Sequence, residues 1–170
     1  FDGTERDRDS LPVSVKTRIG FDHPVIEEWI ANLLEMDPAA IAIHGRILKQ
    51  FHGGTVHWDK IAKAKEMAKN TPTIIMGNGD VKDINQAREK IKETGVDGIL
   101  LGRAAMGNPW LFKNYDATIE ERFAVAVEHA QLYEQTFSHE EKYNFLPMRK
   151  HLGWYVKEFN GASEVRKQLV

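Results

Sequence analysis

Polar side chains that suit an electron-rich ligand follow four short apolar runs along this 170-residue chain. In chain order they are Lys16 and Arg18, then His44 and Arg46, then Asn78 and Asp80, and finally Arg103. In parallel α/β folds the carboxyl ends of the strands form the active face. Because these side chains recur at corresponding places in four successive units, the sequence predicts that they converge on one ligand.

Two of these apolar runs, at residues 74–80 and 99–105, end in glycine and are followed by a predicted helix. Glycine lets the backbone approach a ligand closely, and the first N–H groups of a helix bind anions. The last two strands of a (β/α)8 barrel hold phosphate in this way. The pair therefore predicts a cofactor that carries a phosphate group.

The elements that must position these residues follow a βα rhythm. Near-continuous apolar runs, which are typical of a parallel sheet buried on both faces, predict strands at Leu11–Val15, Ala39–Ile43, Thr73–Met76 and Gly98–Leu101. Amphipathic patterns predict helices at Val25–Leu34, Trp58–Ala68 and Ile84–Ile91. Four strands do not close a barrel, which needs eight. The fold is therefore either half of a barrel or a small open α/β sheet.

The chain from Asp116 onward has a helical pattern and an uneven charge. Thr118 and Glu121 form a capping box at the start of the first predicted helix, and a second helix follows Pro147. Residues 116–141 hold seven acids and one Arg, whereas residues 142–170 hold six Lys and Arg and two Glu. A basic stretch with Trp154 and Tyr155 suits RNA phosphates and bases. A solvated helix face beside core aromatics explains the pattern equally well.

Composition excludes several classes of protein. The net charge of −2 gives no general attraction to nucleic acid or membrane, and no apolar run is long enough to span a bilayer. The chain contains no cysteine, which excludes a disulfide framework, a thiolate metal site and a cysteine nucleophile. We expect no metal site and a cytoplasmic protein.

Several motifs together resemble the tRNA-dihydrouridine synthases. The resemblance covers nearly all of the chain and is carried by Pro12–Gly20, Ile43–Arg46, Gly77–Asp80, Leu101–Trp110 and Met148–Tyr155. It implies an FMN-binding (β/α)8 TIM barrel followed by a small all-α domain that binds tRNA. It also implies reduction of the C5–C6 bond of uridine in tRNA, with NADPH as the reductant and FMN as the carrier. On this basis, residues 1–115 are the C-terminal half of the barrel and residues 116–170 are the helical domain.

The resemblance also implies roles for individual residues. Lys16 and His44 would lie beside the isoalloxazine and act in catalysis. The FMN phosphate would be held by Asn78, Gly79, Asp80, Gly102 and Arg103. The uridine or the tRNA would contact Arg18, Arg46, Arg149, Lys150, Tyr155 and Lys157.

The chain departs from the family at its N-terminal end. It begins at what resembles the fifth strand, and the family's protonating cysteine, on the loop after the fourth strand, has no counterpart here. We therefore expect a fragment that is inactive alone. We also expect self-association through the open sheet edges, unless Phe1–Ser10 or the helical tail covers one of them.

Two other functions remain open from the residues alone. One is a different FMN-dependent TIM-barrel oxidoreductase, similar to dihydroorotate dehydrogenase. The other is a binding module for phosphate or RNA that catalyses no reaction.

Overall fold

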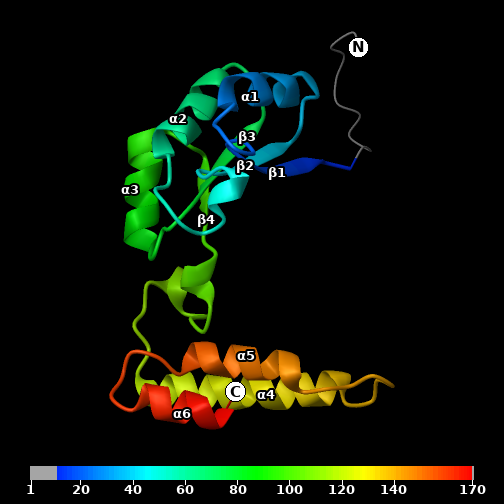
Figure 1. The fold of residues 1–170 in the computed structure, drawn as a ribbon, viewed down its shortest axis with the longest axis vertical. Helices are drawn as coiled ribbons and strands as arrows, with labels where there is room; N and C mark the ends of the chain where they lie inside the picture. The colour runs from blue at the N-terminus through cyan, green and yellow to red at the C-terminus, as the bar shows by residue number, and fades with distance from the viewer. Residues whose placement is uncertain (1–10, 170) are drawn as a thin grey trace. The chain divides into compact units, whose positions relative to one another are not determined.

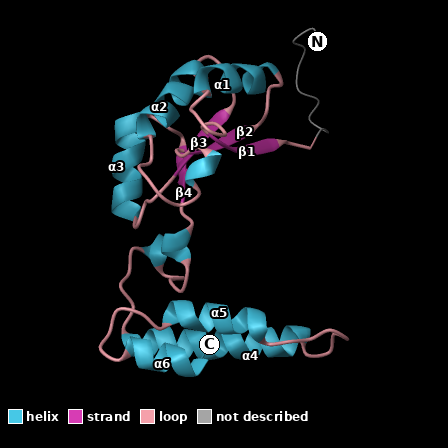
Figure 2. Ribbon diagram, viewed as in Figure 1, coloured by secondary structure: helices cyan, strands magenta, loops and turns pink. Residues whose placement is uncertain are grey.

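The computed structural model describes residues 11–169, so the expected edge cover at Phe1–Ser10 lies outside the described residues. The chain forms two compact units, Phe1–Leu101 and Gly102–Val170. From sequence we placed this boundary after residue 115. Figures 1 and 2 show the elements of each unit.

The first unit contains a four-stranded parallel sheet in the order β1-β2-β3-β4, which confirms the predicted α/β class. The strands are β1 (Ser14–Arg18), β2 (Ala40–His44), β3 (Ile74–Asn78) and β4 (Gly98–Leu100). The first three begin and end later than predicted. As a result Lys16, Arg18, His44 and Asn78 lie within the strands and not in the loops beyond them.

Helices α1 (Ile26–Glu35), α2 (Trp58–Met67) and α3 (Ile84–Thr94) lie along one face of this sheet (Figure 1). The side chains of Ile41, Ile43 and Ile75 on that face are fully buried, and they form the core with helix residues such as Ile30 and Ile61. Alternate residues of a strand point to opposite faces. The core therefore uses every second strand residue.

The other face of the sheet has no such cover within residues 11–101. Ala40, Ala42 and Met76 are only partly buried there, and Ile74 is 49% exposed. The prediction of a sheet buried on both faces is therefore wrong for the described residues. Apolar runs alone did not reveal that all three helices pack on the same side.

Local signals fix the ends of α3. The Asp83 carboxylate accepts a hydrogen bond from the Gln86 amide at 2.8 Å and caps the first turn. Gly95 ends the helix with φ of 73°, a left-handed conformation that favours glycine.

The second unit contains helices α4 (Ile119–Phe137), α5 (Leu146–Tyr155) and α6 (Ala162–Leu169), and Thr118 and Glu121 form the predicted capping box. Two short 3-10 turns, Arg103–Ala105 and Leu111–Lys113, precede them. Gly107 packs directly against the carbonyl of Trp154, and Lys157 donates to the Met106 carbonyl at 3.4 Å. These contacts explain why this segment belongs with the helices. Across residues 11–169, no helix is long and apolar enough to cross a membrane.

Candidate functional site

Three predicted site residues form one row across the sheet. Arg18 pairs in register with His44, and His44 pairs with Asn78. Residues in register on parallel strands point to the same face, and Lys16 shares that face because it precedes Arg18 by two positions. This is the face without helices. The register thus brings together Lys16, Arg18, His44 and Asn78.

Hydrogen bonds connect this row to its surroundings. Lys16 Nζ lies 3.5 Å from Asn78 Oδ1, and Asn78 Nδ2 donates to the Leu100 carbonyl at 2.8 Å. Arg18 Nη1 donates to the Ile47 carbonyl at 3.0 Å. Asn78 thereby joins β1, β3 and β4, while the exposed Lys16 keeps its ammonium group at the surface of the row.

His44 is uncharged at neutral pH in this setting. Burial, and then the nearby charges of Arg18, Lys16 and Arg46, lower the pKa of His44 to about 4, against the opposing effect of Asp80. Among the described residues, its Nδ1 atom is buried without a hydrogen-bond partner. A buried polar atom without a partner costs free energy. The site therefore suits a ligand that supplies a hydrogen-bonding group here.

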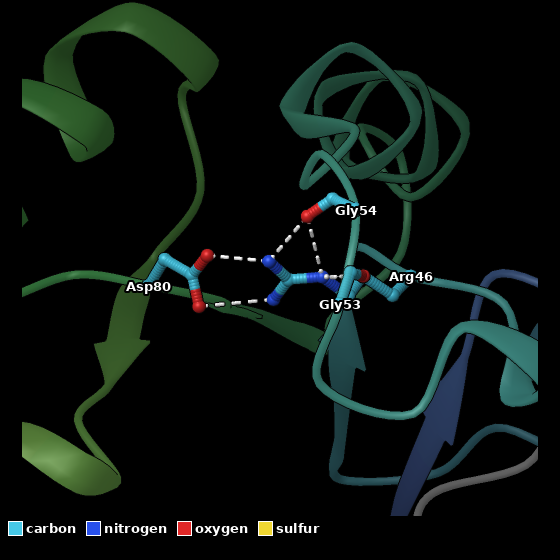
Figure 3. Close-up of polar contacts among 4 residues, drawn as sticks. All are labelled: Arg46, Gly53, Gly54 and Asp80. Carbon is cyan, nitrogen blue, oxygen red and sulfur yellow. Dashed lines mark hydrogen bonds and ion pairs between the residues drawn. The ribbon is translucent and has the colours of Figure 1, made fainter.

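Arg46 is placed differently from the expectation that it faces uridine. Its side chain is buried and donates to both carboxylate oxygens of Asp80, at 2.9 and 2.5 Å (Figure 3). Further bonds run to the carbonyls of Gly53 and Gly54. The hydrogen bond with Asp80 raises the pKa of Arg46. Gly53 and Gly54 were not predicted as part of the site. Two glycines in succession were the signal in the sequence that could have indicated them.

The backbone just after β3, at Gly79, has a conformation and a close neighbour that require glycine. Its φ is 144°, and a Cβ atom there would lie 2.5 Å from Val56 Cγ1. A Cβ atom at Gly45, after β2, would lie 2.6 Å from the same Val56 atom. Val56, which the motifs did not single out, thus fills the space that these two glycines leave.

The second glycine turn belongs to the second unit. Gly102 precedes the 3-10 turn Arg103–Ala105, and a Cβ atom at Gly102 would meet nothing within 4 Å. The predicted helix does not follow, since Gly107 and Pro109 interrupt the chain four and six residues after Arg103. Open space beside Gly102 leaves its backbone accessible.

The basic residues expected to contact tRNA differ in exposure. Arg149 and Lys150 are exposed, with the Lys150 ammonium 5.3 Å from the centre of the Trp154 ring, while Lys157 is partly buried. Tyr155 is only 7% exposed, and its hydroxyl lies 3.2 Å from His129 Nδ1. Burial raises the pKa of Tyr155. In this structure Tyr155 packs between α4 and α5, and its contact with tRNA stays a prediction.

Within residues 11–169, no group of three or more His, Cys, Asp or Glu side chains is placed to hold a metal ion. The polar row of the first unit consists of two cations, an imidazole and an amide.

A family model described as "Dihydrouridine synthase (Dus)" matches residues 5–170. The chain belongs to the dihydrouridine synthase family. It is 32% identical over 94% of its length to a probable tRNA-dihydrouridine synthase of Mycobacterium leprae, of which it covers 44%. It is 34% identical over 94% of its length to tRNA-dihydrouridine synthase B of Pseudomonas aeruginosa, of which it covers 50%. Membership of this family decides against the alternative that the chain is an oxidoreductase similar to dihydroorotate dehydrogenase.

A third relative gives the same coverage. The chain is 34% identical over 94% of its length to a probable tRNA-dihydrouridine synthase of Staphylococcus epidermidis, and it covers 50% of that protein. The chain therefore spans about half the length of the family members that it matches.

We predict that the ring of His44 titrates near pH 4 and not near its ordinary 6.5. Replacing Lys16 by Gln should raise this pKa because one repelling charge is lost, and Asp80→Asn should lower it further. Chemical shifts of the ring, followed by NMR from pH 8 to 3.5, measure these changes. Titration of the unmodified chain near 6.5 would contradict the assignment.

The lowered pKa of His44 also makes the stability of the folded chain depend on pH. The unfolded chain binds the proton at the ordinary pKa, so the contribution of His44 to stability is present above pH 6.5. It is lost as the pH falls from 6.5 toward 4. Urea unfolding should show a smaller loss over this range in His44→Gln than in the unmodified chain.

Proposed function

We propose that this chain is the C-terminal part of a flavin-dependent tRNA-dihydrouridine synthase, with half of the TIM barrel and a helical tRNA-binding domain. The observation that carries the proposal is the row Lys16, Arg18, His44 and Asn78 on the uncovered face of a parallel sheet. Family membership and the names of the relatives support it. Such an enzyme would act in the cytoplasm, where tRNA is found.

The residues of this row fit FMN. Its isoalloxazine offers hydrogen-bonding groups to the unpartnered Nδ1 of His44, and Lys16 is an exposed cation on the same face. When bound, FMN would supply hydride taken from NADPH for reduction of the uracil C5–C6 bond. A preorganised ammonium group stabilises negative charge that develops beside it. We assign that role to Lys16.

His44 contributes hydrogen bonding without charge. Because its pKa is lowered to about 4, the neutral ring has one N–H donor and one acceptor nitrogen at neutral pH. It can therefore orient a ligand without adding a third positive charge to Lys16 and Arg18. We assign Arg18 to the uridine or its phosphate.

We propose that the glycine turns hold the FMN phosphate. In the first unit we assign this role to Asn78, Gly79 and Asp80. For the second unit we propose phosphate binding separately, at Gly102 and Arg103, where the backbone beside Gly102 is accessible. A guanidinium donates charge-assisted hydrogen bonds to phosphate in a fixed fork. The proton for C5 of uracil has no cysteine donor in this sequence. We therefore propose that this chain alone does not reduce uridine.

The helical unit supplies the surface proposed for tRNA. Arg149, Lys150 and Lys157 lie in or just after α5, within the basic part of the sequence. Lys and Arg bind nucleic acid through phosphate charge, which makes affinity depend on salt. The alternative module without catalysis would keep these contacts and lack the flavin, so flavin binding separates the two functions.

Replacement of Arg103 by Ala should weaken FMN binding about tenfold or more, since a hydrogen bond to a charged group contributes about 1.5–3 kcal/mol. Riboflavin, which lacks the phosphate, should bind both forms equally. Quenching of flavin fluorescence measures both affinities. Lys113→Ala, in the following 3-10 turn, is the matched control. An unchanged FMN affinity in Arg103→Ala would place the phosphate elsewhere.

We further propose that the isolated chain self-associates through its sheet edges. Among the described residues of the first unit, β1 pairs only with β2 and β4 only with β3. Leu11 and Val13, just before β1, are 87% and 65% exposed. Unpaired strand edges and exposed apolar side chains favour association.

Light scattering at micromolar concentration should detect dimers or larger species. Val13→Lys should reduce association because a charged residue at a strand edge opposes pairing. Val127→Lys, on the exposed part of α4, serves as the control and should leave it unchanged. A monomer with one cooperative melt would favour a self-sufficient open sheet.

A further inference from the structure

The ion pair of Arg46 and Asp80 joins the ends of two neighbouring strands. Arg46 follows β2 and Asp80 follows β3, and the pair is bidentate (Figure 3). The side chain of Arg46 is 3% exposed and that of Asp80 is 41% exposed. Bidentate pairs between guanidinium and carboxylate groups are strong and geometrically specific. The pair thus fixes the distance between these two strand ends.

The same guanidinium also holds a loop that is distant from Asp80 in sequence. Arg46 Nε donates to the Gly53 carbonyl at 2.9 Å, and Nη2 donates to the Gly54 carbonyl at 2.6 Å. All three nitrogens of Arg46 are therefore engaged within the protein. A side chain with this arrangement is directed at its own loops and not at an external base or phosphate.

The held loop continues directly into the residue that packs against Gly79. Val56 follows Gly54 by two positions and occupies the space beside both Gly45 and Gly79. Backbone hydrogen bonds join the same parts, from the Gly45 amide to the Asn78 carbonyl at 3.0 Å and from the His57 amide to the Gly45 carbonyl at 2.7 Å. The position of Gly79 therefore depends on a loop that Arg46 anchors.

Charge argues against direct contact between Asp80 and a phosphate group. A carboxylate and an ionised phosphate are both acceptors and repel each other. The bidentate bond to Arg46 compensates the charge of Asp80, so the Asn78–Asp80 turn can lie beside an anion. Asp80 then contributes through Arg46 and the backbone.

We infer that Arg46 and Asp80 are positioning residues. Their ion pair anchors the Gly53–Val56 loop against Gly79 and so sets the backbone of the Asn78–Asp80 turn for the phosphate of FMN, without either side chain touching the ligand. The inference rests on the proposed function for the identity of the ligand. It reassigns Arg46 from the uridine and Asp80 from the phosphate.

The first test compares FMN with riboflavin in Asp80→Asn and Arg46→Lys. We expect FMN affinity to fall about tenfold in each variant, with riboflavin affinity unchanged, because only the phosphate turn is disturbed. Asp59→Asn, an exposed carboxylate in the first turn of α2, is the matched control and should change neither. The ratio of the two affinities is a readout that general destabilisation does not alter.

Two results of this test would overturn the inference. Tighter FMN binding by Asp80→Asn would mean that the carboxylate faces the phosphate directly. Equal weakening of FMN and riboflavin would mean that the pair supports the fold in general and not the phosphate turn.

A second test needs no ligand. Amide hydrogen exchange at Gly53, Gly54 and Gly79 should be faster in Asp80→Asn and Arg46→Lys than in the unmodified chain and in Asp59→Asn, while amides of β1 stay unchanged. Unchanged exchange at Gly79 would overturn the positioning role. If the unmodified chain binds FMN no more tightly than riboflavin, the proposed phosphate site fails, and exchange alone decides whether the pair holds the turn.

Discussion

The parallel register of β1, β2 and β3 is the constraint on which the candidate site depends. Because Arg18, His44 and Asn78 are in register, their side chains must share a face, and Lys16 shares it by alternation. Ile41, Ile43 and Ile75, at alternate positions of β2 and β3, lie on the other face and are buried under the helices. The alternation of side chains along the strands thus places the isoleucines in the core and the polar residues in one row on the opposite face.

The charged side chains near the ends of β1 and β2 differ in whether they bind groups within the protein or face the surface. Arg46 is engaged by Asp80 and two carbonyl groups, so its charge is used inside the protein. Lys16 is exposed on the open face, and burial together with the cations around His44 lowers the pKa of that ring and keeps it neutral. The arrangement leaves a face that is positively charged, carries an uncharged imidazole, and suits an anionic aromatic ligand.

Much of the fold was visible in short-range patterns. The strands, the helices, the Gly95 end of α3 and the capping box of α4 each depend on neighbouring residues, and the structure has them. Contacts between distant segments were not visible. Arg46 and Asp80 are 34 positions apart, and their bond depends on the register of two strands. The resemblance assigns Tyr155 to tRNA, and the sequence does not reveal that Tyr155 is buried beside His129 of α4.

We propose above all that the uncovered face of the sheet binds FMN. Hydrogen exchange of the whole chain with and without FMN tests it most directly, since it reports where the ligand protects the backbone. We expect slower exchange at residues 16–18, 44–46 and 77–81 when FMN is added, with residues on the helix-covered side unchanged. Protection confined to α4–α6, or no protection at any residue, would contradict it.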